Sequence, residues 1–301
     1  MTPCPGKKFA LLCGKARNRG GWKTGLDPLT VRTADGKQSG KKQREIKNAV
    51  HFTPQPQYDG KGCLAYKIAV STLDHESLFG FMMVPAKAGR YPVLVSVPGA
   101  SKLVNKPVEK VFPQDVIDVM MNVHRVDPSN EPVVYEGQKK SILPLRYAGI
   151  PDPEKYYYRN AILGINAVID HLAEDPRWDG RHLVFRGASQ GGAFALFMGG
   201  LNQHLTAVIS EITAMCDHGG YLAERSPGWP MLYLKATEQI KREEIMSMSG
   251  YYDGVNFARR ITVPLLMLVG FKDDTCSPSS VYAAYNAATA KKEIVNDVNA
   301  G

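Results

Sequence analysis

The stretch Gly187-Ala188-Ser189-Gln190-Gly191 decides the fold of this chain. It follows the apolar run Leu183-Val184-Phe185 and precedes the small and apolar residues 192–196. A G-x-S-x-G pattern between a strand and a helix is typical of a nucleophile elbow, a sharp turn that exposes a serine hydroxyl above a sheet. The flanking glycines remove Cβ atoms that would collide where strand and helix approach. The stretch predicts Ser189 as a nucleophile, although the same glycines also suit a tight turn without catalysis.

A serine nucleophile needs N–H donors for the oxyanion that forms when it attacks a carbonyl. One predicted donor is the backbone N–H of Gln190, directly after the serine. The second is the backbone N–H of Ala100, in the loop that follows the apolar run 92–97. The alternative is that Pro98-Gly99 only caps the end of a strand.

In α/β-hydrolases, whose nucleophile lies on such an elbow, the acid and base follow the nucleophile in the order serine, acid, histidine. The apolar run 263–269 leads to Asp273 and Asp274, and either carboxylate could orient an imidazole while the other caps a helix or faces water. All seven histidines precede Asp273. We therefore expect the catalytic histidine to lie beyond residue 301, and His218 to be structural or close to the substrate rather than a substitute base.

Alternating apolar strands and amphipathic helices predict an α/β fold, a mostly parallel central sheet with helices on both faces. Two β-rich runs, 64–72 and 77–84, predict an antiparallel hairpin as an N-terminal β-rich extension, and the C-terminal end of the fold is expected to be incomplete. Residues 101–150 are expected to be mainly loops. The remaining expected elements are strands at 92–97, 116–123, 182–186, 206–212, 262–269 and from 293, and helices at 156–173, 190–200, about 231–248 and 278–288.

The net charge of +8 is concentrated at the N-terminus. Residues 1–50 hold twelve Lys and Arg against three acids, whereas the other 251 residues hold 25 against 26. We interpret residues 1–60 as a basic, poorly ordered segment and residues 61–301 as the hydrolase domain. A basic nucleic-acid-binding arm is the alternative, but composition alone does not separate such an arm from a solvated tail. No nucleic-acid partner is expected.

The composition of the chain limits which cellular locations and cofactors are expected. No apolar run reaches the length of about eighteen residues that a membrane span needs, and the apolar run 9–12 is shorter than a signal-peptide core. We therefore expect a cytoplasmic protein without a membrane partner. The five cysteines are scattered, with no spacing typical of a metal site. Free thiols, no metal and no cofactor are expected.

Several segments together resemble the acetyl xylan esterase and cephalosporin C deacetylase family of carbohydrate esterases, over roughly residues 62–301. The resemblance implies an α/β-hydrolase fold, removal of acetyl groups from short xylooligosaccharides or similar small esters without a metal, and a homo-oligomer, often a hexamer. It selects Asp273 over Asp274, because the family acid precedes a cysteine by three residues. The segments are Tyr156-Tyr157-Tyr158-Arg159, Trp178-Asp179-Gly180-Arg181, residues 186–192, Tyr251-Tyr252-Asp253, residues 255–258, residues 270–276 and Ala283-Ala284-Tyr285-Asn286.

The chain also departs from the family pattern. Pro98-Gly99-Ala100 replaces the family's His-Gly-Tyr, which keeps the backbone donor and changes the wall of the pocket. Residues 1–40 match nothing familiar from the family, and the family's histidine, about thirty residues after its aspartate in a Gly-His turn, is not reached by Gly301. The first hypothesis is a carboxylic ester hydrolase that acts on a small acetyl ester. The alternative is a catalytically inactive hydrolase-fold binding protein.

Overall fold

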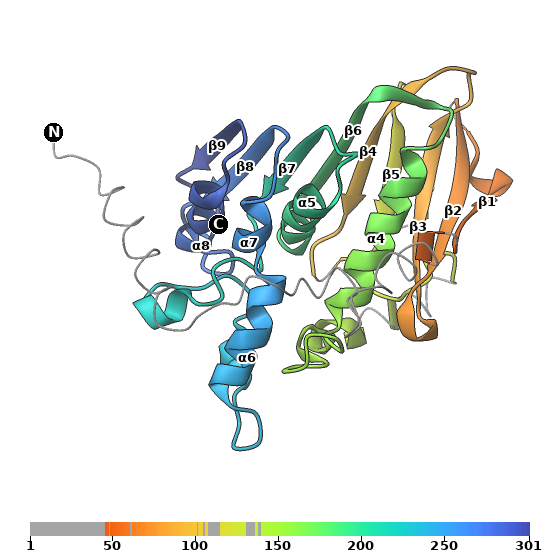
Figure 1. Ribbon diagram of the computed structural model, residues 1–301. Coiled ribbons are helices and arrows are strands. Elements are labelled where there is room, and N and C mark those ends of the chain that lie inside the picture. Colours follow the sequence, from red (N-terminus) through yellow and green to blue (C-terminus); the bar gives the residue numbers. More distant parts are fainter. Residues whose placement is uncertain are drawn as a thin grey trace, which may run out of the picture.

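The computed structural model describes residues 46–47, 49–60, 62–100, 102–104, 106–107, 115–130, 136–137 and 140–301. These residues form a nine-stranded sheet in the order β1-β2-β3-β5-β4-β6-β7-β8-β9, with its two edges at β1 and β9 (Figure 1). Most of the basic N-terminal segment lies outside the described residues. The strands are β1 (Val50–Pro54), β2 (Cys63–Ser71), β3 (Ser77–Pro85), β4 (Tyr91–Val97), β5 (Ile117–Met121), β6 (Trp178–Ala188), β7 (Ala207–Glu211), β8 (Leu265–Gly270) and β9 (Lys292–Asp297).

The N-terminal part of the sheet is antiparallel. Strands β2 and β3 pair over nine residues, from Cys63 opposite Pro85 to Ser71 opposite Ser77, and this confirms the predicted hairpin. Strand β1 adds to the outer side of β2, also antiparallel. The expectation of irregular chain up to residue 60 is therefore wrong for Val50–Pro54. Only Val50 in this strand is buried, so an exposed edge strand carries little of the alternating pattern that would have predicted it.

The six strands β5, β4, β6, β7, β8 and β9, given in their order across the sheet, run parallel, as the alternation of strands and helices predicts. From β5 onward each helical connection leads in the same direction across the sheet, and right-handed crossovers then place their helices on one face. Figure 1 shows this row of helices in front of the sheet. The helices are α4 (Tyr158–Leu172), α5 (Gln190–Leu201), α7 (Gly254–Ala258) and α8 (Pro278–Ala287).

Burial along the strands follows this arrangement. In β8, Leu265, Met267 and Val269 are buried, whereas Leu266 and Leu268 on the opposite face are only half buried. The same alternation holds in β4, β5 and β7. Helix α5 is apolar on all sides because it packs on β6 and β7 and has α4 and α7 as neighbours. The core that supports the elbow therefore lies between the sheet and these helices.

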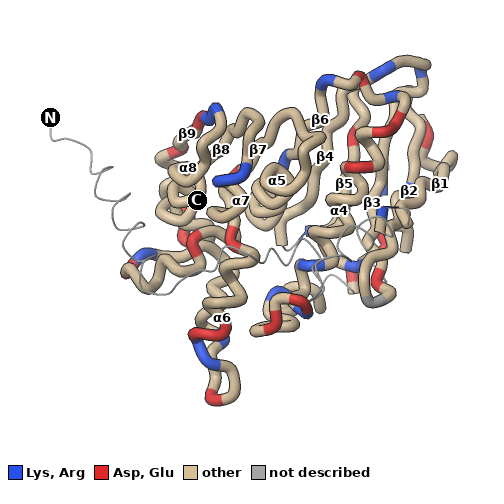
Figure 2. The backbone as a smooth tube through the Cα atoms, in the orientation of Figure 1, with Lys and Arg blue, Asp and Glu red and all other residues tan. Residues whose placement is uncertain are grey.

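The stretch between β7 and α7 differs from its prediction. In place of one helix at about 231–248, a 3-10 helix (Leu232–Lys235) and α6 (Arg242–Ser249) are separated by a turn in which Thr237 accepts hydrogen bonds from the backbone N–H groups of residues 239 and 240. Helix α6 projects away from the sheet (Figure 1) and carries charges of both signs (Figure 2). In the described part of the chain, no helix has the length and apolar character of a membrane span.

Candidate active site

Ser189 occupies the turn between β6 and α5, as predicted. Its backbone has φ 57° and ψ −120°, a left-handed conformation that is rare and strained for a residue other than glycine. Three hydrogen bonds hold it. Its N–H donates to the carbonyl of Glu211 at 2.9 Å, and its carbonyl accepts from the N–H groups of Ala193 and Ala214 at 3.1 Å. Since the strained backbone is fixed by these bonds, the Cα–Cβ bond that carries the hydroxyl has a defined direction.

Two glycines of the elbow are required by close backbone approaches. A Cβ at position 187 would lie 2.2 Å from the carbonyl oxygen of Gly191, and a Cβ at position 191 would lie 2.4 Å from the carbonyl oxygen of Val97.

Gly187→Ala is therefore expected to lower the free energy of unfolding by about 2 to 3 kcal/mol, because a backbone atom must move to admit the methyl group. Gly60→Ala, with no atom within 4 Å of the added Cβ, is the matched control and should change it little. Urea denaturation of both variants checks this, and equal midpoints would contradict the packing argument.

The two predicted oxyanion donors lie on either side of Ser189. Gln190 is the first residue of α5, where backbone N–H groups have no intrahelical partner and the helix dipole favours negative charge. On the other side, a Cβ at Gly99 would be 3.8 Å from the Cβ of Ser189, so the loop that carries Ala100 runs beside the nucleophile. The structure thus brings the loop after β4 close to the elbow, although the two segments lie about 90 residues apart in the sequence.

The two candidate acids differ in their surroundings. Asp273 is half buried, and its Oδ1 accepts hydrogen bonds from the N–H of Thr275 at 2.9 Å and of Cys276 at 2.7 Å. Asp274 is exposed, and its one polar contact with the described residues is the Thr275 hydroxyl, 3.5 Å from its Oδ1. Only the first carboxylate is therefore fixed by the backbone of the loop after β8.

Sequence analysis did not select Cys276, although its thiol is the side chain that meets the predicted nucleophile. The Sγ atom lies 3.8 Å from the Oγ of Ser189, and the residue is 2% exposed. Burial raises the pKa of the thiol to about 12, so it is protonated at neutral pH and does not act as a base. Its position three residues after Asp273 was the signal that could have found it. Through Cys276 the loop of the predicted acid reaches the elbow.

No imidazole contacts Ser189 in the part of the chain that the structure describes. His218 is 2% exposed, its backbone N–H donates to Asp253 Oδ2 at 2.8 Å, and its ring nitrogens make no complete hydrogen bond with the described residues. Burial lowers its pKa, and the Asp253 carboxylate acts in the opposite direction. These contacts fit a structural role, one of the two alternatives that the sequence analysis left open for His218.

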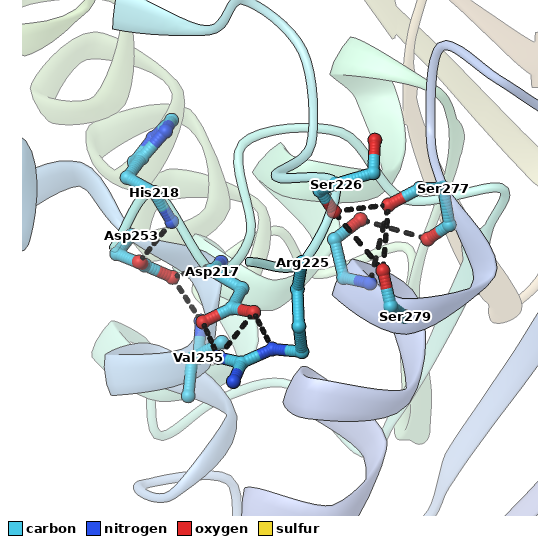
Figure 3. Close-up of polar contacts among 9 residues, drawn as sticks. Asp217, His218, Arg225, Ser226, Asp253, Val255, Ser277 and Ser279 are labelled. Carbon is cyan, nitrogen blue, oxygen red and sulfur yellow. Dashed lines mark hydrogen bonds and ion pairs between the residues drawn. The ribbon is translucent and has the colours of Figure 1, made fainter. Parts of the chain in front are cut away.

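A polar network fixes the loop after β7 (Figure 3). The Asp253 carboxylate, at the start of α7, accepts from the N–H groups of Asp217, His218 and Val255 at 2.8–3.0 Å. Arg225 pairs with Asp217 through bonds of 2.8–2.9 Å. The loop needs this support because Ile212, Met215 and Asp217 all have positive φ. Sequence analysis missed the network, which joins positions about 35 residues apart.

The same loop holds the segment after Asp273. The carbonyl of Ser226 accepts from the hydroxyls of Ser277 and Ser279 at 2.6 and 3.0 Å (Figure 3). The N–H of Trp229 also donates to the carbonyl of Thr275 at 3.0 Å. The described residues contain no cluster of three His, Cys, Asp or Glu side chains suited to a metal ion. What the site offers chemically is a strained serine hydroxyl, backbone N–H donors and a fixed carboxylate.

A strained serine between a central parallel strand and a buried helix, with the next loops at its side, defines a protein of the α/β-hydrolase class. A family model for acetyl xylan esterase (AXE1) matches residues 37–299. The chain belongs to this acetyl xylan esterase family. The match begins inside the segment that we interpreted as a poorly ordered tail.

Solved structures with similar folds include an acetyl xylan esterase from Paenibacillus, with a TM-score of 0.71, 22% identity, and coverage of 91% of this chain and 93% of that one. Acetyl xylan esterase 1 from Thermoanaerobacterium has a TM-score of 0.66 and 19% identity, with coverage of 93% and 94%. An acylaminoacyl peptidase from Pyrococcus horikoshii has a TM-score of 0.51 and 15% identity, with coverage of 83% and 44%. At these identities the likeness shows the fold.

Among curated proteins, the acetyl esterase Axe7A of Xylanibacter ruminicola is 32% identical over 244 residues, which are 78% of this chain and 54% of that protein. The chain thus spans about half the length of this relative. Together with the family match, this identity confirms the resemblance drawn from the motifs.

Proposed function

We propose that this protein is a carboxylic ester hydrolase that removes acetyl groups from small acetylated carbohydrates, such as xylooligosaccharides. The observation that carries the proposal is the strained Ser189, held between the loop of Gly99 and the thiol of Cys276. Membership of the acetyl xylan esterase family and the acetyl esterase relative support the acyl group and the substrate class.

The proposed reaction is a two-step acyl transfer. The base removes the proton of Ser189 as its Oγ attacks the acetyl carbonyl, and the backbone N–H groups of Gln190 and Ala100 hold the oxyanion. The C–O bond to the sugar then breaks, and the sugar alcohol leaves with the proton from the base. In the second step water gives a proton to the base and attacks the acetyl-serine, and acetate leaves as the base returns that proton to the serine oxygen. A small acyl group suits the site, since the buried Cys276 side chain lies against Ser189.

The base in this proposal is a histidine that follows residue 301, oriented by Asp273. Two features support it. No imidazole contacts Ser189 within the described residues, and the Asp273 carboxylate is fixed through Oδ1 while its Oδ2 accepts no hydrogen bond from them. In the family that the motifs resemble, the histidine follows the aspartate by about thirty residues, so in this numbering it would come directly after Gly301.

The base is tested by comparing residues 1–301 with a chain extended through the first downstream histidine. Hydrolysis of an activated acetate, measured as kcat/KM, is expected to be at least about a thousandfold lower for residues 1–301, because oxyanion donors without a base give only residual catalysis. Release of acetate from an acetylated xylooligosaccharide by the extended chain tests the substrate class.

Two other outcomes would change the proposal. Equal, high activity in both chains would mean that a histidine within residues 1–301 is the base, and His218→Ala would be the first variant to measure. Absence of turnover in both chains, with binding of acetylated xylooligosaccharide retained, would favour the alternative of a catalytically inactive hydrolase-fold binding protein.

A further inference from the structure

Three consecutive tyrosines, Tyr156, Tyr157 and Tyr158, lie where α4 begins, and each is buried with 5% exposure or less. Their hydroxyl groups have different hydrogen-bond partners. Tyr156 donates to the carbonyl of Arg146 at 3.0 Å, whereas Tyr157 contacts His124, which follows β5, and Tyr158 contacts Gln190, which begins α5. Burial raises the pKa of Tyr157 to about 12 and that of Tyr158 well above its usual range. Both hydroxyls therefore keep a proton to donate.

Tyr158 holds the side chain of the residue that follows the nucleophile. Its hydroxyl donates to Gln190 Oε1 at 2.7 Å, and both side chains are fully buried. The Nε2 of Gln190 has no partner among the described residues. The tyrosine hydroxyl is therefore the polar contact that fixes this amide. Because Gln190 is the first residue of α5, fixing its side chain also restricts the backbone N–H that faces the oxyanion.

Tyr157 reaches the other loop through a buried histidine. Its hydroxyl lies 3.0 Å from Nδ1 of His124, which is 1% exposed. Burial lowers the pKa of His124 to about 4, and a contact with the backbone of Ala100 opposes this shift. His124 is thus neutral at neutral pH, and the backbone of Ala100 is among the groups that affect its pKa. Its Nε2 is buried and makes no complete hydrogen bond among the described residues.

We propose that Tyr157 and Tyr158 are positioning residues for the two oxyanion donors, Tyr158 through the Gln190 side chain and Tyr157 through the His124 ring against Ala100. In this proposal the Tyr157 hydroxyl donates to Nδ1, and the neutral imidazole then carries its proton on Nε2. Edge-to-face packing of the two tyrosine rings, with centroids 5.3 Å apart, couples both halves of the oxyanion hole to one helix end. This inference rests on the proposed function of Ser189.

The test is Tyr157→Phe and Tyr158→Phe, with Tyr156→Phe as the matched control, in the chain that turns over an activated acetate. Losing an oxyanion donor outright lowers kcat by about 10² to 10³, so disturbing one donor should lower kcat by about tenfold. The KM should stay within about twofold, because the oxyanion forms only in the transition state. The double variant should lose more than either single variant, and the deviation of its loss from a hundredfold measures how far the two packed rings act together.

Tyr156→Phe removes an equally buried hydroxyl bond and should lower the Tm about as much as the other two variants while leaving kcat unchanged. His124→Gln, which keeps an N–H near Ala100, should retain more activity than His124→Leu. Equal kcat in all three tyrosine variants, or an effect confined to KM, would overturn the inference. Retained activity in Ser189→Ala would instead refute the proposed function, so the two failures are distinguishable.

Discussion

Ser189→Ala is expected to lower kcat by about 10⁶ in the chain that contains the base, and to abolish covalent labelling by a phosphonate or sulfonyl fluoride. The acetyl-enzyme forms on the Oγ of this residue, and removing the nucleophile of a serine triad has an effect of about this size. Wild-type protein should incorporate one label per chain, because only a serine activated by a base beside oxyanion donors reacts rapidly. Turnover of an activated acetate and peptide mapping of the label are the two measurements.

Cys276→Ala is the matched control for this prediction. It removes the thiol that lies 3.8 Å from the serine oxygen without removing the nucleophile. Since burial raises the pKa of that thiol to about 12, it does not compete for the label at neutral pH. The variant should therefore still be labelled at position 189. Finding the label on any other residue of the wild-type protein would refute the assignment of Ser189.

The centre of the fold and the elbow could be predicted because their signals are local. The G-x-S-x-G pattern, the strand before it and the helix after it lie within about twenty residues. The glycines indicate places where two backbone segments come too close for a side chain. The antiparallel hairpin was also predictable, since β2 and β3 are separated by only five residues. These elements needed no knowledge of distant contacts.

Other parts depend on contacts between distant positions. Ser189 meets Cys276 across 87 residues of sequence, and Tyr158 meets Gln190 across 32. The residue types at these positions do not predict that the two members of each pair are in contact. The single face that carries α4, α5, α7 and α8 follows from the strand order, in which β5 lies on the other side of β4 from β6. The order of the strands across the sheet cannot be predicted from the alternation of strands and helices along the chain.

The second large effect on kcat is expected at Asp273, the first of the two aspartates after β8. Asp273→Asn is expected to lower kcat by about 10⁴ in the chain that contains the base, because an imidazole without its orienting anion adopts the wrong tautomer. The amide should still accept from the N–H groups of Thr275 and Cys276 through its oxygen, so the loop should keep its conformation. Activity would then fall without a comparable loss of stability, which kcat and thermal unfolding measure together.

Asp274→Asn is the matched control, one residue further along the same loop. Its carboxylate is exposed and makes one long contact, so kcat should change less than about twofold. A large loss in Asp274→Asn with a small one in Asp273→Asn would mean that the other carboxylate orients the base. Equal losses in both variants, accompanied by a lowered Tm, would instead show that the loop as a whole supports the Cys276 contact with Ser189 and that neither charge acts on an imidazole.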